Sequence, residues 1–360
     1  MLPNWLKSLH WSLFLSTLSL AVIGILFIFS ASHYDAGNYA GKQTVWVLIG
    51  FFVFFIFSRM SFRVFIGTSY LFYAVTVLLL AIVLVFTEAR LGAQRWISIG
   101  PFALQPSEFA KLATVLALAN YLGTHRPWEH ETKALCVALG LAVLPLALIM
   151  KQPDLGSALL FVPMIVTLLF LWGIRYRYLI GTVLAGLMGV PVLWFALKEY
   201  QRKRIMVFLD PNSDPLGAGY TALQSRIAVG SGGFFGKGFL HGTQSQLDFV
   251  PEHHTDFIFC VIGEEWGYLG VLVILACYFF LFQAIFHVIQ STTDPQARLL
   301  AAGILAMLFA QAFINIGMSF GLMPITGITL PLISYGGSSF IATAAALGLI
   351  LSIYRERSIF

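Results

Sequence analysis

A single carboxylate, Asp256, stands where a polar segment gives way to a strongly apolar one. It belongs to the stretch Leu247–Glu265, LDFVPEHHTDFIFCVIGEE, in which a proline and two histidines precede the run FIFCVIG. An acidic side chain at the edge of such a run costs free energy unless it is solvated, paired or used. Its type and position leave four roles open: N-cap of the helix that follows, ion-pair partner, ion-transport site or general base.

Basic and glycine-rich residues precede this acid. Arg202 and Arg204 open the segment, and Lys237 lies within GSGGFFGKGFLHGTQSQL at 230–247. The glycine density is typical of phosphate-binding loops, but neither the first glycine nor the final Ser or Thr of the Walker motif is present. Two interpretations stay open: a backbone nest with these cations holds a pyrophosphate, or the cations lie at the lipid headgroups.

Two histidines, His253 and His254, precede Asp256 by three and two residues. The HExxH metal motif is absent, and paired histidines at a headgroup region are expected to be exposed rather than to bind metal. His254 is nevertheless a candidate substrate contact. Glu264 lies two turns further along the same expected helix, near the Asp256 face, where it can hydrogen-bond into a polar interior.

Other charged residues lie at two helix starts. Glu108 and Lys111 are three residues apart, so a helix places them on one face. Either they neutralise each other near the membrane, or Lys111 and Arg95 face a cavity and meet an anionic substrate. Asp154, in KQPDLGSA, either caps the helix that follows it or joins the same site.

The segment 315–340, NIGMSFGLMPITGITLPLISYGGSSF, carries no charge and breaks helix repeatedly with Pro and Gly. Irregular backbone at membrane depth survives only where it is buried in protein or lines a cavity. We therefore expect this segment to form the floor of a site, with Ser334 as a candidate contact.

The composition predicts an all-α, polytopic membrane protein. Of 360 residues, 59% are hydrophobic and 10% are charged, well outside the range of soluble domains. The three cysteines lie in apolar runs without metal or disulfide spacing. No repeat or linker divides the chain, so 1–360 is expected to be one domain. With about 20 apolar residues for each crossing, we expect ten spans: 9–31, 43–58, 64–87, 106–123, 134–150, 155–173, 178–197, 257–289, 299–320 and 337–354.

The positive charges predict the orientation of these spans. Ten crossings put both termini on one side, and the cations of the short segments divide ten to four in favour of a cytoplasmic position for the termini. The ten are Lys7, Arg59, Arg63, Arg126, Lys133, Arg175, Arg177, Arg298, Arg355 and Arg357, and the four are Lys42, Arg90, Arg95 and Lys151. The long loop between the seventh and eighth spans, about 198–256, is then extracytoplasmic, where loops of such length tend to carry function.

Together these motifs resemble the SEDS family (shape, elongation, division and sporulation), over nearly the whole chain. The matching segments are GAQRWI, QPSEFAK, QPDLGSA, DPLGAGY, QSRIAVGSGG and PEHHTDFIF, with Asn315, Gly321, Pro324, Gly327 and Ser334–Ser339 of the last loop. HGTQSQLDFVPEHHTDFIF is most similar to the elongation branch, RodA.

The resemblance implies a peptidoglycan glycosyltransferase that polymerises lipid II on the outer face of the bacterial cytoplasmic (inner) membrane, with the family's essential aspartate at Asp256. It also implies a class B penicillin-binding transpeptidase and the MreB/MreC/MreD elongation complex as partners. Lipid II and membrane lipids are the other expected contacts, and no nucleic acid is expected. Asp256 as general base fits the chemistry, because attack by a sugar hydroxyl releases a proton. Arg204, Lys237, Lys111 or a divalent cation (Mg²⁺ or Mn²⁺), whose ligands the sequence does not assign, would stabilise the leaving pyrophosphate.

Two functions of other classes compete with this one. A lipid II flippase accounts for ten spans, the charges of Glu108 and Lys111, and broken backbone at depth. The second is a scaffold that only recruits the transpeptidase. Against the flippase, the chain has no matching half-chain repeats; against the scaffold, Asp256, Arg204 and the glycine-rich loop are expected on one face.

Overall fold

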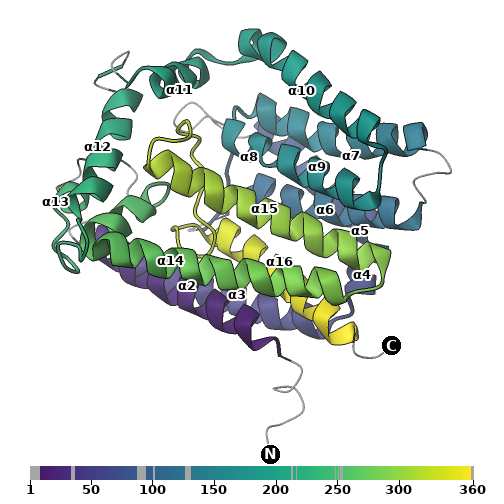
Figure 1. Ribbon diagram of the computed structural model, residues 1–360, viewed down its shortest axis with the longest axis horizontal. Helices are drawn as coiled ribbons and strands as arrows, with labels where there is room; N and C mark the ends of the chain where they lie inside the picture. The colour runs from purple at the N-terminus through teal and green to yellow at the C-terminus, as the bar shows by residue number, and fades with distance from the viewer. Residues whose placement is uncertain are drawn as a thin grey trace, which may run out of the picture.

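The computed structural model of the protein describes residues 9–33, 37–86, 95–99, 102–125, 131–211, 214–215, 217–247, 249, 251 and 254–357. Lys7, Arg90, Arg126 and His253 lie outside these ranges. The described chain is almost entirely helical, as expected (Figure 1). The long helices are α2 (Trp11–Ala31), α3 (Tyr39–Arg59), α5 (Ser69–Phe86), α6 (Pro106–Thr124), α7 (Glu131–Lys151), α9 (Phe161–Trp172), α10 (Tyr176–Ala196), α14 (Ile258–Ser291), α15 (Pro295–Ser319) and α16 (Gly337–Glu356).

Shorter elements fill the connections. They are α4 (Phe62–Gly67), α8 (Leu155–Leu159), α11 (Glu199–Leu209), α12 (Ala218–Ser231), α13 (Thr243–Gln246) and the strands β1 (Ile97–Ile99) and β2 (Phe102–Leu104). The strands form an antiparallel hairpin in which Ile97 pairs with Leu104. The expected extracytoplasmic loop is therefore largely helical, and the short helix predicted around TALQSRIAV is α12.

Each expected span coincides with a long helix, α8 and α9 together forming the sixth. Eight of these helical segments in the described chain are long and apolar enough to cross a membrane. The other two, α6 and α10, do not meet that criterion among the described residues, so the number of ten crossings stays a prediction.

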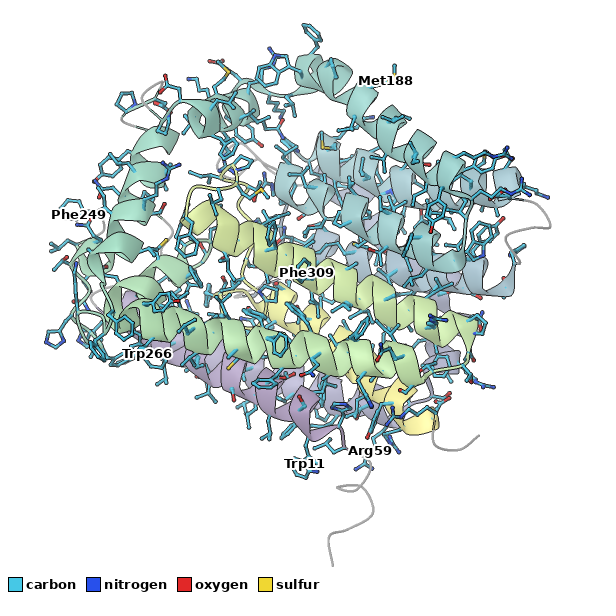
Figure 2. The ribbon with its side chains drawn as sticks, in the orientation of Figure 1. Trp11, Arg59, Met188, Phe249, Trp266 and Phe309 are labelled. Atoms are coloured by element: carbon cyan, nitrogen blue, oxygen red, sulfur yellow. The ribbon has the colours of Figure 1, made fainter. Side chains whose placement is uncertain are left out.

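The protein is a multi-pass membrane protein. Large apolar side chains such as Phe309 lie exposed on the outer surface of the bundle, as lipid contact requires (Figure 2).

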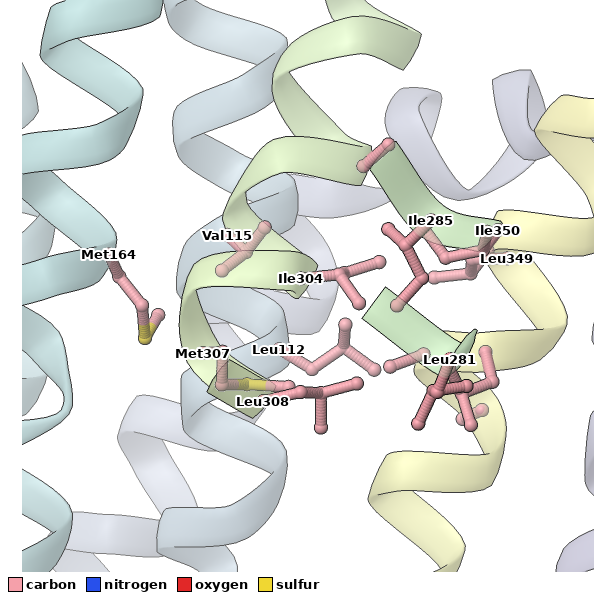
Figure 3. Packing of buried hydrophobic residues seen from close by; sticks show 14 of the residues in the cluster. Leu112, Val115, Met164, Leu281, Ile285, Ile304, Met307, Leu308, Leu349 and Ile350 are labelled. Carbon is pink, nitrogen blue, oxygen red and sulfur yellow. The ribbon is translucent and has the colours of Figure 1, made fainter. Parts of the chain in front are cut away.

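The bundle has a buried centre made of α6, α15 and α16. Helix α3 packs along α16, α2 along α14, and α15 packs against α6, α9 and α14 (Figure 1). Leucine, isoleucine, valine and methionine side chains from α6, α9, α14, α15 and α16 fill the interior (Figure 3). Small residues allow close approach: a Cβ on Gly303 of α15 would lie 2.5 Å from a side-chain carbon of Val115 of α6.

Helix α14 is kinked at Gly267, whose φ of 61° and ψ of −154° are not helical. The kink frees backbone groups, and the glycine-rich loop that follows α12 satisfies them. Lys237 N–H donates to the Glu264 carbonyl at 3.0 Å, and Tyr268 N–H donates to the Gly233 carbonyl at 2.9 Å. The glycines of this loop thus allow its backbone to lie directly against the backbone of α14. A Cβ on Gly267 would lie 2.3 Å from the Gly236 nitrogen.

Candidate active site

Asp256 lies in the turn that precedes α14. Phe257, rather than Asp256, occupies the N-cap position of that helix. The backbone carbonyl of Asp256 accepts a hydrogen bond of 2.8 Å from the Asn315 side chain, whose amide also donates to the Ile328 carbonyl at 2.6 Å. Asn315 is fully buried on α15. This side chain therefore ties the Asp256 backbone to the connection between α15 and α16.

The Asp256 side chain meets Arg204 beside Gly327. A Cβ built on Gly327 would lie 3.4 Å from Oδ2 of Asp256 and 3.5 Å from Nη1 of Arg204. Arg204, on α11, donates to the Ile325 carbonyl at 3.3 Å, which anchors it to the same connection. The Asp256 carboxyl is partly exposed. The site therefore presents a carboxylate next to a cation. Both groups lie against the backbone of Gly327, which has no side chain.

Electrostatics around Arg204 agree with this placement. Burial is the main cause that lowers the pKa of the Arg204 guanidinium below its ordinary value, and the neighbouring Asp256 carboxylate opposes that shift. Arg95 lowers the pKa further, whereas Tyr200 and Asp154 raise it. Arginine stays protonated in proteins even so. Arg204 is thus a half-buried charged group, and partial burial strengthens its interaction with an anion.

A second cation, Arg95, lies next to Arg204. Its Nη1 is 3.7 Å from Oδ1 of Asp154, and it donates to the Pro153 carbonyl and, at 3.5 Å, to the Tyr200 hydroxyl. Arg95, Tyr200, Arg204 and Thr326 are among the residues that line one small cavity. The segments before α6, before α8, within α11 and between α15 and α16 therefore converge on one site.

Asp154 has the structural role that helix capping predicts. Its Oδ1 accepts from Ser157 N–H at 3.2 Å at the start of α8, and its Oδ2 accepts from Gln105 at 3.3 Å. The side chain is 2% exposed. Asp154 caps α8 and also contacts Arg95, so its predicted roles as a helix cap and as part of the site are compatible. Both of its carboxylate oxygens have partners within the protein.

Glu108 and Lys111 form a buried pair on α6, with 2.8 Å between Lys111 Nζ and Glu108 Oε1. Lys111 also donates to Gln311 at 3.3 Å, and Gln311 donates to the Thr329 carbonyl at 3.0 Å. Through these contacts the pair joins α6, α15 and the α15–α16 connection. Lys111 is only 1% exposed. A role of the pair in substrate binding stays a prediction.

Lys237 and Arg202 are engaged elsewhere in the fold. Lys237 Nζ lies 2.7 Å from Oε1 of Glu264, which is fully buried and also accepts from Thr243 and from Gln244 N–H. Arg202 donates to the Trp194 and Phe195 carbonyls at 2.9 and 2.8 Å, at the end of α10. These contacts give both cations structural partners. The third predicted loop cation, Arg204, lies next to Asp256.

Ser334 and His254 support the site from the other end of the α15–α16 connection. Ser334 is 4% exposed, and its hydroxyl accepts from Leu330 N–H at 2.7 Å, which closes a turn. The His254 carbonyl accepts from Tyr335 N–H at 3.1 Å. Contact of either side chain with substrate stays a prediction.

The described residues contain no cluster of three or more His, Cys, Asp or Glu side chains that could hold a metal ion. Asp154 is already committed to Ser157, Gln105 and Arg95. One carboxylate, Asp256, fits the way in which Mg²⁺ binds through one or two carboxylates plus substrate phosphates. A divalent cation at this site therefore stays a prediction.

Sequence reasoning did not single out Tyr200, Gln201 or Gln311. Tyr200 and Gln201 line the cavity with Arg95 and Arg204, and Gln311 is the partner of Lys111. Tyr200 stands four residues before Arg204, so helical spacing around the basic cluster could have pointed to it. Gln311 lies within an expected span, and a polar amide at such a place is a usable signal.

A family model described as a cell cycle protein, for FtsW, RodA and SpoVE, matches residues 10–359. The chain belongs to this family. It is 40% identical to the peptidoglycan glycosyltransferase MrdB of Escherichia coli K12 over 347 residues, which cover 96% of this chain and 93% of the relative. The membership confirms the resemblance to the SEDS proteins.

Two solved structures share the whole fold. A chain from a peptidoglycan synthase complex that coordinates polymerisation and crosslinking has a TM-score of 0.83 and 34% identity, with 97% of this chain and 98% of that chain covered. The rod shape determining protein RodA of Thermus thermophilus has a TM-score of 0.75 and 32% identity, with 99% of each chain covered.

Proposed function

We propose that this protein is the peptidoglycan glycosyltransferase of cell elongation, which joins the disaccharide units of lipid II into glycan strands. The observation that carries the proposal is the meeting of Asp256 and Arg204 at Gly327. Family membership, the MrdB relative and the RodA structure support the substrate class. A transferase of this kind needs a base for an attacking hydroxyl and a cation for a leaving phosphate, and this site offers both.

In the proposed reaction, a sugar 4-hydroxyl of the acceptor attacks the anomeric carbon of the donor. Asp256 accepts the hydroxyl proton as the new carbon–oxygen bond forms. The bond between the anomeric carbon and the phosphate oxygen breaks, and its electron pair leaves with the lipid pyrophosphate. Direct displacement of an α-linked group inverts the carbon and gives a β linkage. The proton then passes from Asp256 to water, which returns the site to its first state.

Arg204 and Arg95 would face the developing negative charge of the leaving group. Arg204 is half-buried and adjacent to Asp256, so its field acts where little water screens it. Asp154 and Tyr200 hold the second cation in place. A divalent cation held by Asp256 and the substrate phosphates would supply further charge neutralisation when bound. Pyrophosphate leaves without protonation, so one acid residue suffices.

The cellular setting follows from the same proposal. The end of the bundle that carries α11, α12 and α13 would lie outside the cytoplasmic membrane, with both termini inside. Lipid tails would remain in the bilayer beside the apolar outer face of the helices. The relative from a peptidoglycan synthase complex supports a penicillin-binding transpeptidase as partner, and the MreB, MreC and MreD proteins belong to the proposed elongation assembly.

The product of the reaction tests the function directly. Purified protein with its cognate transpeptidase is reconstituted in liposomes with lipid II, and moenomycin is added to silence contaminating polymerases. The proposal predicts long glycan strands that a muramidase cleaves to disaccharides, which establishes the β linkage. Translocation of lipid II between leaflets without strand formation would favour the flippase, and neither activity, with the transpeptidase correctly localised in cells, would favour the scaffold.

A further inference from the structure

Three aromatic rings from distant parts of the chain gather around His254, two residues before Asp256. The Tyr39 ring, at the start of α3, lies 4.6 Å from the His254 ring and 5.2 Å from the Tyr335 ring, measured between centroids. The His254 and Tyr335 rings are 6.1 Å apart. All three residues are partly exposed. We call these three residues the aromatic cluster.

Backbone and amide contacts, not the rings themselves, hold the aromatic cluster in place. Tyr335 N–H donates to the His254 carbonyl. Gln43, one turn after Tyr39 on α3, donates to the Ser334 carbonyl at 3.4 Å and accepts from Gly336 N–H at 3.2 Å. Gln43 is 1% exposed. The cluster is therefore positioned by backbone and amide contacts rather than by hydrogen bonds of the Tyr39 and Tyr335 hydroxyls.

The hydroxyls of the two tyrosines are available to a ligand. Within the part of the chain that the structure describes, neither the Tyr39 nor the Tyr335 hydroxyl makes a hydrogen bond. Tyrosines that only fill a core usually find a partner for this group. Partly exposed aromatic faces with open hydroxyls suit a ligand that has both apolar C–H surface and hydroxyl groups, which describes a pyranose ring.

Asp256 follows the aromatic cluster in the chain by two residues and lies next to Arg204 in space. His254, two residues before Asp256, contacts the Tyr335 end of the α15–α16 connection, whereas Asp256 and Arg204 meet at its Gly327 end. Arg95 lines one small cavity with Arg204 and contacts Asp154 and Tyr200. A base that transfers a proton from one sugar while a pyrophosphate leaves another must have the two substrates on different sides.

We propose that the aromatic cluster of Tyr39, His254 and Tyr335 is the subsite for the acceptor sugar, and that the side of Arg204 and Arg95 is the subsite for the donor pyrophosphate. This inference rests on the proposed glycosyl transfer and assigns its two substrates to two surfaces. The acceptor pyranose lies against the tyrosine rings, with its reactive hydroxyl directed to Asp256. The tyrosine hydroxyls bond to hydroxyl or amide groups of the same sugar.

Two analogues separate the substrates in the test. A 4-deoxy lipid II acts only as donor, and a lipid II with a methylene in place of the anomeric oxygen acts only as acceptor, because its carbon–carbon bond does not break. Single condensation is followed while each analogue is varied. Tyr39→Leu and Tyr335→Leu are expected to raise the acceptor KM roughly threefold to tenfold, the range of one aromatic contact, and to change the donor KM less than about twofold.

Further variants make the result decisive. Tyr176→Leu makes the same change at a 70% exposed position at the start of α10, and is expected to leave both constants at the wild-type value. The double variant Tyr39→Phe and Tyr335→Phe keeps the rings, so it reports on the hydroxyls even if the leucine variants fold poorly, and is expected to raise the acceptor KM about threefold. An unchanged acceptor KM, or an equal rise in both constants, would overturn the assignment. No condensation by the wild type would instead overturn the proposed function.

Discussion

The carboxylate of Asp256 and the guanidinium of Arg204 both approach Gly327, a residue with no side chain and a φ of 74°. Positive φ is costly for residues that carry a Cβ. The backbone conformation is therefore the reason for a glycine here, since a Cβ would make only ordinary contacts with the two charged groups. The pairing depends on a connection that Asn315 fastens to the Asp256 backbone.

Replacement of Gly327 by alanine is expected to reduce polymerisation at least tenfold. The φ of 74° is strained for alanine, and relief of that strain would shift the connection against which Asp256 and Arg204 lie, although the methyl itself would make ordinary contacts of 3.4 and 3.5 Å with them. Polymerisation rates at equal amounts of folded protein measure the effect. Gly181→Ala is the matched control, since nothing lies within 4 Å of a Cβ there. Equal polymerisation rates for both variants would show that the placement of Asp256 and Arg204 against Gly327 does not affect catalysis.

Replacement of Arg204 by glutamine is expected to slow the chemical step by about a hundredfold, the magnitude typical of one lost charge-stabilising donor. Arg204→Lys should recover only part of the rate, because lysine lacks the planar fork that bonds phosphate at two points. Single-turnover rates with saturating lipid II provide the measurement. Arg177→Gln, a change at a solvent-exposed arginine near the other end of the bundle, is the control. A larger KM with an unchanged turnover rate would assign Arg204 to ground-state binding instead.

The pair of Lys237 and Glu264 is expected to act on stability. Lys237→Met leaves the fully buried Glu264 carboxylate without its cation, a change that typically costs about 3 to 5 kcal/mol. The double variant Lys237→Met and Glu264→Gln removes both charges and is expected to regain a large part of that loss. Thermal unfolding midpoints in one detergent, compared in a double-mutant cycle, test the coupling. Additive shifts would mean that the contact contributes nothing.

The kink of α14 gives a further expectation. Gly267→Ala places a methyl 2.3 Å from the Gly236 nitrogen, in a backbone region that only glycine adopts readily. The variant should lower the thermal midpoint and expose the glycine-rich loop to proteases. Gly140→Ala, with nothing within 4 Å of the new Cβ, is the comparison. An unchanged digestion rate would show that the loop is held by other contacts.

The sequence was most informative where one physical rule dominates. Apolar runs of about 20 residues predicted all the long helices, because a membrane span must be both apolar and that long. Asp154 was predicted as a cap from its place before LGSA, and the structure shows that cap. Asp256 could be singled out because a charge is rare at such a boundary. These inferences need only neighbours in the chain.

Contacts between distant segments were beyond sequence reasoning. Lys237 was expected either at a pyrophosphate or at the lipid headgroups, but its pairing with Glu264 depends on how the glycine-rich loop meets the kink at Gly267. The hairpin of β1 and β2 has strands of three residues, too short for a periodic signal. The approach of Arg204 to Asp256 requires α11 to meet a connection more than a hundred residues away.

The central claim is that Asp256 is the base of a glycosyl transfer. Its most direct test is polymerisation of lipid II by the wild type, Asp256→Asn and Asp210→Asn, each at equal folded amount with the cognate transpeptidase and moenomycin. Asp210→Asn makes the same change at an exposed residue beside the end of α11 and should retain wild-type polymerisation. The account predicts a loss of about a hundredfold to ten-thousandfold for Asp256→Asn alone. Strands formed by Asp256→Asn at the wild-type rate would contradict it.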